Sequence, residues 1–100
     1  MVSFDSSSDA RFMSSLLDMG KEAYTDVLGA LHDITGQHYS WQQFIDLFGW
    51  TPLNLNGPDI FPGGNELHQF QIHSAPNRSY TVVGYTHDNV IVVCAIARKV

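Results

Sequence analysis

Cysteine is almost absent from this chain of 100 residues, which contains Cys94 alone and so cannot form an internal disulfide. A single thiol is typical of proteins from a reducing compartment. The first residues carry neither a basic stretch nor an apolar run, so they do not resemble a secretory signal. No apolar run approaches the roughly 20 residues of a membrane span. These absences predict a cytoplasmic protein that does not enter a membrane.

Positive charge is also scarce. Five Lys and Arg face ten Asp and Glu, for a formal net charge of -5, and the cations are scattered as Arg11, Lys21, Arg78, Arg98 and Lys99. Phosphate backbones are bound by clustered cations, because counterion release supplies much of the affinity. A helix-turn-helix over residues 27–48 is disfavoured too, since residues 41–48 contain no Lys or Arg. We therefore expect no direct binding to nucleic acid. An acidic surface suits a basic protein partner, although it also keeps a protein soluble.

Sequence motifs for common chemistry are missing as well. There is no paired-cysteine zinc spacing, no glycine-rich phosphate loop after a strand and no G-x-S-x-G turn. Cys94 lies in an apolar strand-like stretch, where a buried inert thiol is expected. The sequence thus predicts no metal and no cofactor, and more readily a binding protein than an enzyme.

What the chain does have is enough apolar material for one domain, with 44% hydrophobic and 12% aromatic residues. Apolar residues recur at helical spacing from Phe12 to Ile34, which predicts a helix capped at Ser6 and ended by Gly36. Gly20 interrupts it, so we expect either a break there or a long helix that overhangs the domain. A second helix begins with a capping box of Ser40 and Gln43 and runs to residue 49.

The third part of the chain predicts a β-sheet. Asp88-Asn89 suits a two-residue hairpin turn between strands 80–87 and 90–97, and strand 67–73 precedes them across a loop of residues 74–79. We predict an α+β fold in one domain, residues 1–100. Its helical part (about 6–49) packs on a three-stranded antiparallel β-meander (67–100), with an irregular loop (50–66) between them. The predicted cross-strand pairs are His73 with Tyr80, His68 with Tyr85, Thr86 with Ile91, Tyr85 with Val92, Val83 with Cys94, and Val82 with Ala95.

The last strand, residues 90–97, is apolar on both of its faces. A half-exposed strand would alternate apolar and polar residues. We expect the helices to cover one face and the long loop to cover the other. The alternative is a homodimer in which a second subunit covers the second face.

Histidines are the only sequence feature that points to chemistry. In the predicted register His68 lies opposite Tyr85 and diagonal to His87, within reach of long side chains. Such a cluster, with Asp88 beside it, suits acid–base catalysis or metal binding. The alternative is that His68 is structural and that His87 belongs to the turn.

Residues 66–72, 80–85 and 90–99 resemble the closing strands of RelE/HigB-type toxins, which are small ribonucleases with helices packed on an antiparallel sheet. That resemblance implies the same sheet and, for catalysis or RNA contact, Arg78, His87, Arg98 and Lys99. Members usually carry arginine where this chain has Gln69 and Gln71, and they are usually basic. These departures count against the RNA-cleaving role.

The function predicted from the sequence is that of a small acidic binding protein, such as an inhibitor, immunity or regulatory factor, that occludes a protein partner. The predicted partner-binding residues are Trp41, Asp46, Trp50, Asp59, Ile60 and Phe61. The alternative is a small ribonuclease-like toxin that uses the sheet face, with His68, Tyr85, His87 and Arg98 as its catalytic groups.

Overall fold

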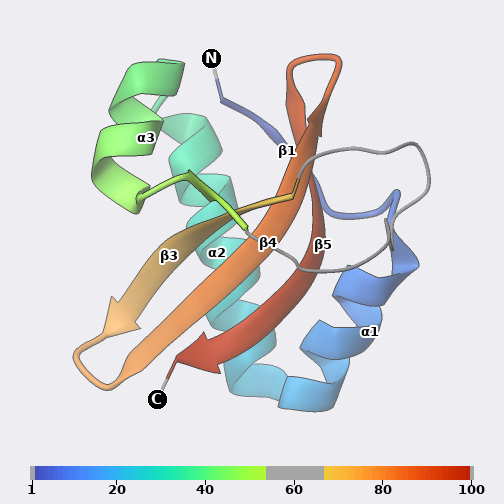
Figure 1. Cartoon of the computed structure of the whole chain (residues 1–100). Coiled ribbons are helices and arrows are strands. Elements are labelled where there is room, and N and C mark those ends of the chain that lie inside the picture. The colour runs from blue at the N-terminus through green and yellow to red at the C-terminus, as the bar shows by residue number, and fades with distance from the viewer. Residues whose placement is uncertain (1, 54–66, 100) are drawn as a thin grey trace.

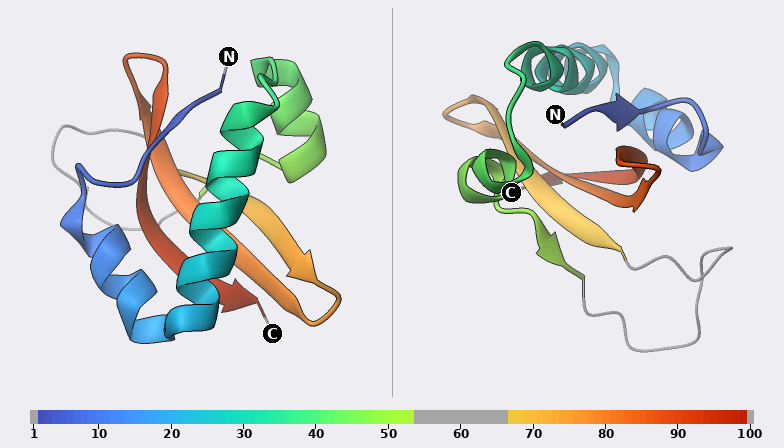
Figure 2. Two further views of the ribbon diagram at one scale, coloured as in Figure 1. Left: turned by 180° about the vertical axis from the view of Figure 1, so that it is seen from behind. Right: turned by 90° about the horizontal axis from the view of Figure 1, so that it is seen from above.

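A computed structural model describes residues 2–53 and 67–99 and shows three helices on one face of a mixed sheet (Figures 1 and 2). The helices are α1 (Ala10–Met19), α2 (Lys21–Gly36) and α3 (Trp41–Phe48). The five strands, in the spatial order β1-β5-β4-β3-β2, are β1 (Phe4–Asp5), β2 (Thr51–Pro52), β3 (His68–Ala75), β4 (Arg78–His87) and β5 (Val90–Lys99). The α+β class is therefore confirmed. Within the described ranges, no helix is long and apolar enough to span a lipid bilayer.

The prediction of a three-stranded meander was incomplete, because a short strand extends it at each edge. β1 runs parallel to β5, where the backbone amide of Ile91 donates to the carbonyl of Ser3 at 2.9 Å. β2 pairs antiparallel with the start of β3, in the region predicted as an irregular loop. Strands of two residues leave no periodicity that a sequence pattern can reveal. Val2 is fully buried, so the N-terminal segment belongs to the core.

The first helical region is broken at Gly20, as one of the two alternatives predicted. Gly20 has φ 102° and ψ 173°, outside the helical region, and it separates α1 from α2. The start of α1 differs from the prediction, since its N-cap is Asp9, whose carboxylate accepts from the amide of Arg11 at 3.0 Å. Ser6 precedes this cap by three residues, in a separate turn held by Asp5.

Asp5 organises that turn, because its carboxylate accepts from the amides of Ser7 and Ser8 at 2.9 and 3.0 Å and from both hydroxyls. These bonds lower the pKa of Asp5 from 3.8 to about 2, and the bond from the Ser8 hydroxyl has the largest effect. A carboxyl whose pKa is depressed in the folded state stabilises the protein above its unfolded pKa and loses that contribution as the pH falls.

We expect Asp5→Asn to reduce stability at neutral pH by no more than about 1 kcal/mol, because the site is near the surface. The difference from the wild type should shrink as the pH falls from about 4 toward 2. Urea unfolding at neutral pH and at about pH 2.5 measures both values. A difference that stays constant with pH would contradict the role given to this carboxylate.

The α3 helix forms as its sequence predicts. The Ser40 side chain accepts from the amide of Gln43 at 3.2 Å, and the Gln43 side chain accepts from the amide of Ser40 at 2.9 Å. Gly49 ends the helix in the left-handed region, with φ 69°. These local bonds help to set where the two tryptophans lie, since Trp41 is the first residue of the helix and Trp50 follows its C-cap, Gly49.

The terminal hairpin is confirmed at its turn, where Asp88 and Asn89 have φ of 51° and 65°. The pairs nearest the turn, Thr86 with Ile91 and Tyr85 with Val92, are as predicted. Beyond them a bulge shifts the register by one residue, so two predicted pairs, Val83 with Cys94 and Val82 with Ala95, were wrong. Val83 instead pairs with Ala95, and Val82 pairs with Ile96.

The physical cause of the bulge lies at Gly84. A Cβ at this position would come within 2.6 Å of the carbonyl oxygen of Val92, so the strands approach here more closely than a side chain allows. The extra residue changes which side chains share a face. As a result Ile91, Val93 and Ile96 all pack into the core beneath the helices.

The register between β3 and β4 also differs from the prediction by one residue. Ile72, not His73, lies opposite Tyr80, and His68 lies opposite Gly84 rather than Tyr85. The predicted loop of residues 74–79 is mostly strand, since Ala75 pairs with Arg78 across a tight turn. A one-residue slip moves side chains to the opposite face of a sheet. This correction changes the predicted histidine cluster.

Both faces of the middle of β5 are buried. Ile91 and Val93 belong to the main core. Val92 and Cys94 do not belong to it, but they are also buried, with only 5% and 1% of their surface exposed. The loop predicted to cover the second face lies, for residues 54–66, outside the described residues, so both that cover and the homodimer stay predictions.

Candidate functional site

The predicted cluster of His68, Tyr85 and His87 is not assembled. His68 shares the helix-covered face of the sheet with Phe70 and Ile72, because its partner across the strands is Gly84. Tyr85 and His87 alternate with Gly84 along β4 and so point to the other face. The residues had been grouped through a register that was wrong by one.

The structure instead brings His68 into a hollow at the turn end of the sheet. This hollow has a volume of about 630 Å³ and is open on one side. It lies between the start of α3 and the β4–β5 turn, two segments at the same end of the molecule (Figure 1). We call it the indole hollow. Its described lining is Trp41, Trp50, His68, Thr86, Asp88 and Asn89.

Packed aromatic rings hold the floor of the indole hollow. The Trp50 ring stacks on His68, with centroids 4.8 Å apart and planes at 9°, and Trp50 is only 8% exposed. Trp41 lies 6.4 Å from Trp50, with the two planes tilted by 54°. Phe44 supports both indoles from the core, at 6.3 and 5.8 Å. The two tryptophans are therefore pre-positioned by packing rather than free to reorient.

The rim of the indole hollow is polar and exposed. Asp88 and Asn89 occupy the turn, and the Asp88 side chain is 89% exposed. Its carboxylate lies 3.4 Å from Nε2 of His87, whose side chain is 69% exposed. With Thr86, the rim offers a carboxylate, a carboxamide and a hydroxyl, all of which can accept hydrogen bonds.

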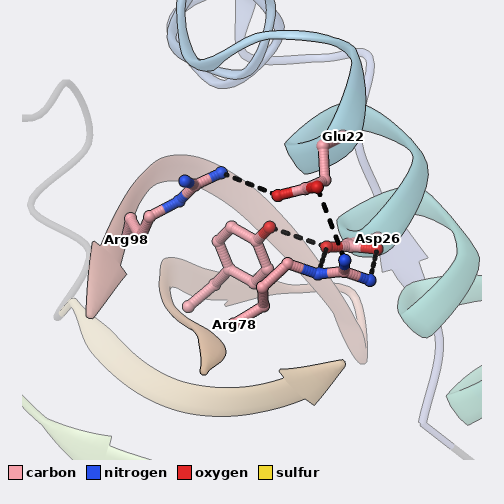
Figure 3. A network of polar contacts seen from close by, with 5 residues as sticks. Glu22, Asp26, Arg78 and Arg98 are labelled. Carbon is pink, nitrogen blue, oxygen red and sulfur yellow. Dashed lines mark hydrogen bonds and ion pairs between the residues drawn. The ribbon is translucent and has the colours of Figure 1, made fainter. Parts of the chain in front are cut away.

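A second polar cluster ties α2 to the far end of the sheet (Figure 3). Asp26 accepts from the Tyr80 hydroxyl at 2.8 Å and lies 3.0 Å from Nε of Arg78. Glu22 lies 3.4 Å from Arg78 and 3.6 Å from Arg98. The pKa of Tyr80 is raised, mainly because its hydroxyl is shielded from water and to a smaller extent because it donates to Asp26.

This cluster changes how the two arginines are interpreted. Two carboxylates balance two guanidiniums, and Arg98 also lies over the Tyr80 ring at 5.6 Å. Arginines engaged in this way are less available to bind phosphate. Of the groups that the toxin resemblance implies, Arg78 and Arg98 are therefore engaged with carboxylates of α2. Lys99 ends β5, at the end of the sheet away from the Asp88–Asn89 turn.

We expect Asp26→Asn to destabilise the protein by about 1–3 kcal/mol, because a largely buried carboxylate that receives bonds from Tyr80 and Arg78 is lost. Thermal or urea unfolding measures the change. Asp33→Asn, at an exposed position on the same helix, is the control and should stay within about 0.5 kcal/mol of the wild type. Equal effects of the two substitutions would show that the cluster contributes little.

Of the other predicted binding residues, the structure describes Asp46. Asp46 is exposed on α3, where it accepts from Gln42 at 3.0 Å. Asp59, Ile60 and Phe61 lie outside the described residues, so their predicted role stays a prediction. Cys94 is buried, and burial raises the pKa of its thiol, which donates to the Val83 carbonyl at 3.5 Å. Among the residues that the structure describes, no group of three metal-ligating side chains is found.

Sequence reasoning identified Trp41, Trp50 and His68 but did not place them together. It missed Thr86 and Asn89 as lining residues, although Asp88 was named beside the histidines. The hollow depends on how α3 packs against the sheet, which is a long-range contact. No local pattern along the chain carries that information.

Comparisons of the chain with protein-family models, with curated proteins and with solved structures found no match.

Proposed function

We propose that the protein is a non-catalytic binding protein that recognises a basic protein partner through one face. We call this face the α3 face and define it by Trp41, Ile45, Asp88 and Asn89. The observation that carries the proposal is the indole hollow, in which two tryptophans held by the core meet an exposed carboxylate. Tryptophan is among the residues that contribute most binding energy in protein interfaces.

Exposed apolar groups on α3 support the proposal. Ile45 is 37% exposed and follows Trp41 by one helical turn, so the two lie on the same side of the helix. Apolar side chains beside an acidic hollow match the usual anatomy of an interface, in which an apolar centre has a polar rim.

The charge of the chain favours a basic partner. The net charge is -5, and the described arginines are paired with carboxylates at other sites. Opposite charge raises the rate of association and disfavours acidic competitors. Such a protein would act by occluding the surface of its partner, as an inhibitor, immunity or regulatory factor does.

Affinity capture with the tagged protein tests this function, with the retained material analysed for both protein and RNA. We expect the wild type to retain a protein in stoichiometric amount, and Ile45→Asp to lose it. Leu17→Asp places the same charge on α1, at a residue 64% exposed, and should retain the partner. Retention of RNA without a protein, abolished by His87→Ala, would instead support the ribonuclease alternative.

A further inference from the structure

We infer that the indole hollow receives an arginine side chain of the partner, with its guanidinium against the Trp41 indole and paired with Asp88. This inference rests on the proposed function and names the chemistry of its central contact. Three observations lead to it: the charge of the hollow, the kind of surface that lines it, and its size.

The charge of the described lining is negative. Asp88 is its one carboxylate, and the lining residues described include no Lys or Arg. Three of the chain's five cations are engaged at other carboxylates: Arg11 pairs with Asp9, Arg78 with Asp26, and Arg98 with Glu22. Lys21 begins α2 and Lys99 ends β5, both outside this lining. With Asp88 as the one charged group of its described lining when His68 is neutral, the hollow therefore favours a cation over a phosphate or carboxylate.

The surface of the hollow distinguishes among cations. The indole is the aromatic side chain that binds cations best, and a flat guanidinium can stack on it while its edge still donates hydrogen bonds. Asp88, Asn89 and Thr86 supply acceptors at the rim, from the end of β4 and the turn that follows it. The ammonium of lysine offers neither a flat face nor a fixed fork of donors.

The size of the hollow fits a segment rather than an isolated ion. A volume of about 630 Å³ is in the range of ordinary ligand pockets and exceeds what one arginine side chain fills. Because the hollow is open, residues flanking the arginine can continue onto α3 and meet Ile45. The expected partner is thus an exposed basic segment with an arginine at its centre.

The direct test uses a short glycine–serine peptide with one central arginine, titrated into the ¹⁵N-labelled protein. We expect the indole N–H resonances of Trp41 and Trp50 to shift, with an affinity in the millimolar range. The matched peptide has citrulline in place of arginine, which keeps the shape and removes the charge. It should bind at least about fivefold more weakly.

Protein variants locate the contact. Asp88→Asn should weaken binding of the arginine peptide by about three- to fivefold, and asparagine tolerates the positive φ of the turn, so the hairpin is retained. Asp18→Asn removes the same charge near the end of α1, away from the turn, and should leave the affinity unchanged. Unshifted indole resonances, equal binding of the citrulline peptide, or equal or tighter binding of a lysine peptide would each overturn the inference.

Failure here is separable from failure of the proposed function. If the peptides do not discriminate but Ile45→Asp still releases a captured partner, the arginine assignment is wrong and the binding face stands. If no protein is captured, or if Ile45→Asp retains it, the proposed function is wrong whatever the peptides show.

Discussion

Replacing Phe44 with alanine is expected to lower the free energy of unfolding by about 3–5 kcal/mol, the usual cost of deleting a fully buried aromatic ring. Phe44 is 0% exposed, and its ring lies 5.2–6.3 Å from five others: Phe4, Trp41, Phe48, Trp50 and Phe70. Phe44 thereby joins the N-terminal strand, α3 and the sheet. Urea unfolding followed by circular dichroism measures the loss.

The control for Phe44→Ala is Leu47→Ala on the same helix. Leu47 is 61% exposed, so its truncation should change stability by less than about 0.5 kcal/mol. Similar losses for the two variants would mean that α3 is not anchored through Phe44. The same pair reports on the indole hollow, because Trp41 and Trp50 lose their shared support only in Phe44→Ala. The intrinsic fluorescence of the folded protein should therefore change in Phe44→Ala and not in Leu47→Ala.

Gly84→Ala is expected to cost about 2–3 kcal/mol, since the added methyl group forces the strands apart at the bulge. The new Cβ would meet the backbone oxygen of Val92 at 2.6 Å and Cγ2 of Ile91 at 3.1 Å. A backbone carbonyl cannot rotate away as the end of a long side chain can. Unfolding in urea, combined with amide exchange across β4 and β5, would show both the cost and its location.

Gly29→Ala tests whether the effect at Gly84 is local. Gly29 lies within α2, and a Cβ there would meet nothing within 4 Å. Alanine in an exposed helix interior is more favourable than glycine by about 0.8–1 kcal/mol, so this variant should be more stable than the wild type. Opposite signs for the two substitutions are expected. A gain at both positions would show that the bulge accommodates a side chain.

These experiments also bear on function, because the bulge and the aromatic cluster both set the geometry of the turn end. Gly84 lies directly opposite His68, and His68 lines the floor of the indole hollow. The turn begins at Asp88, four residues after Gly84 in the same hairpin. A variant with a displaced β4 should therefore bind the arginine peptide less well even where it remains folded. Gly29→Ala should bind it normally.

Local signals in the sequence were sufficient for the elements whose hydrogen bonds are local. The capping box of Ser40 and Gln43 and the turn at Asp88-Asn89 formed as predicted, and the break at Gly20 was one of two alternatives, because each depends on residues within a few positions of one another. The α+β class followed from the order of these elements. Composition and charge likewise needed no structure.

Tertiary structure alone decided the features that depend on distant segments meeting. The close approach of Gly84 to Val92 coincides with a bulge that shifts the register of β4 on β5. A separate irregularity, between His73 and Ala75, shifts the register of β3 on β4, and this separates His68 from Tyr85 and His87. The N-terminal strand joined β5, although its two residues show no periodicity. Above all, the packing of α3 brought Trp41 to the hairpin turn. The position of such a site depends on how the core packs and on how closely the strands can approach. Residues that are neighbours in the sequence do not contain this information.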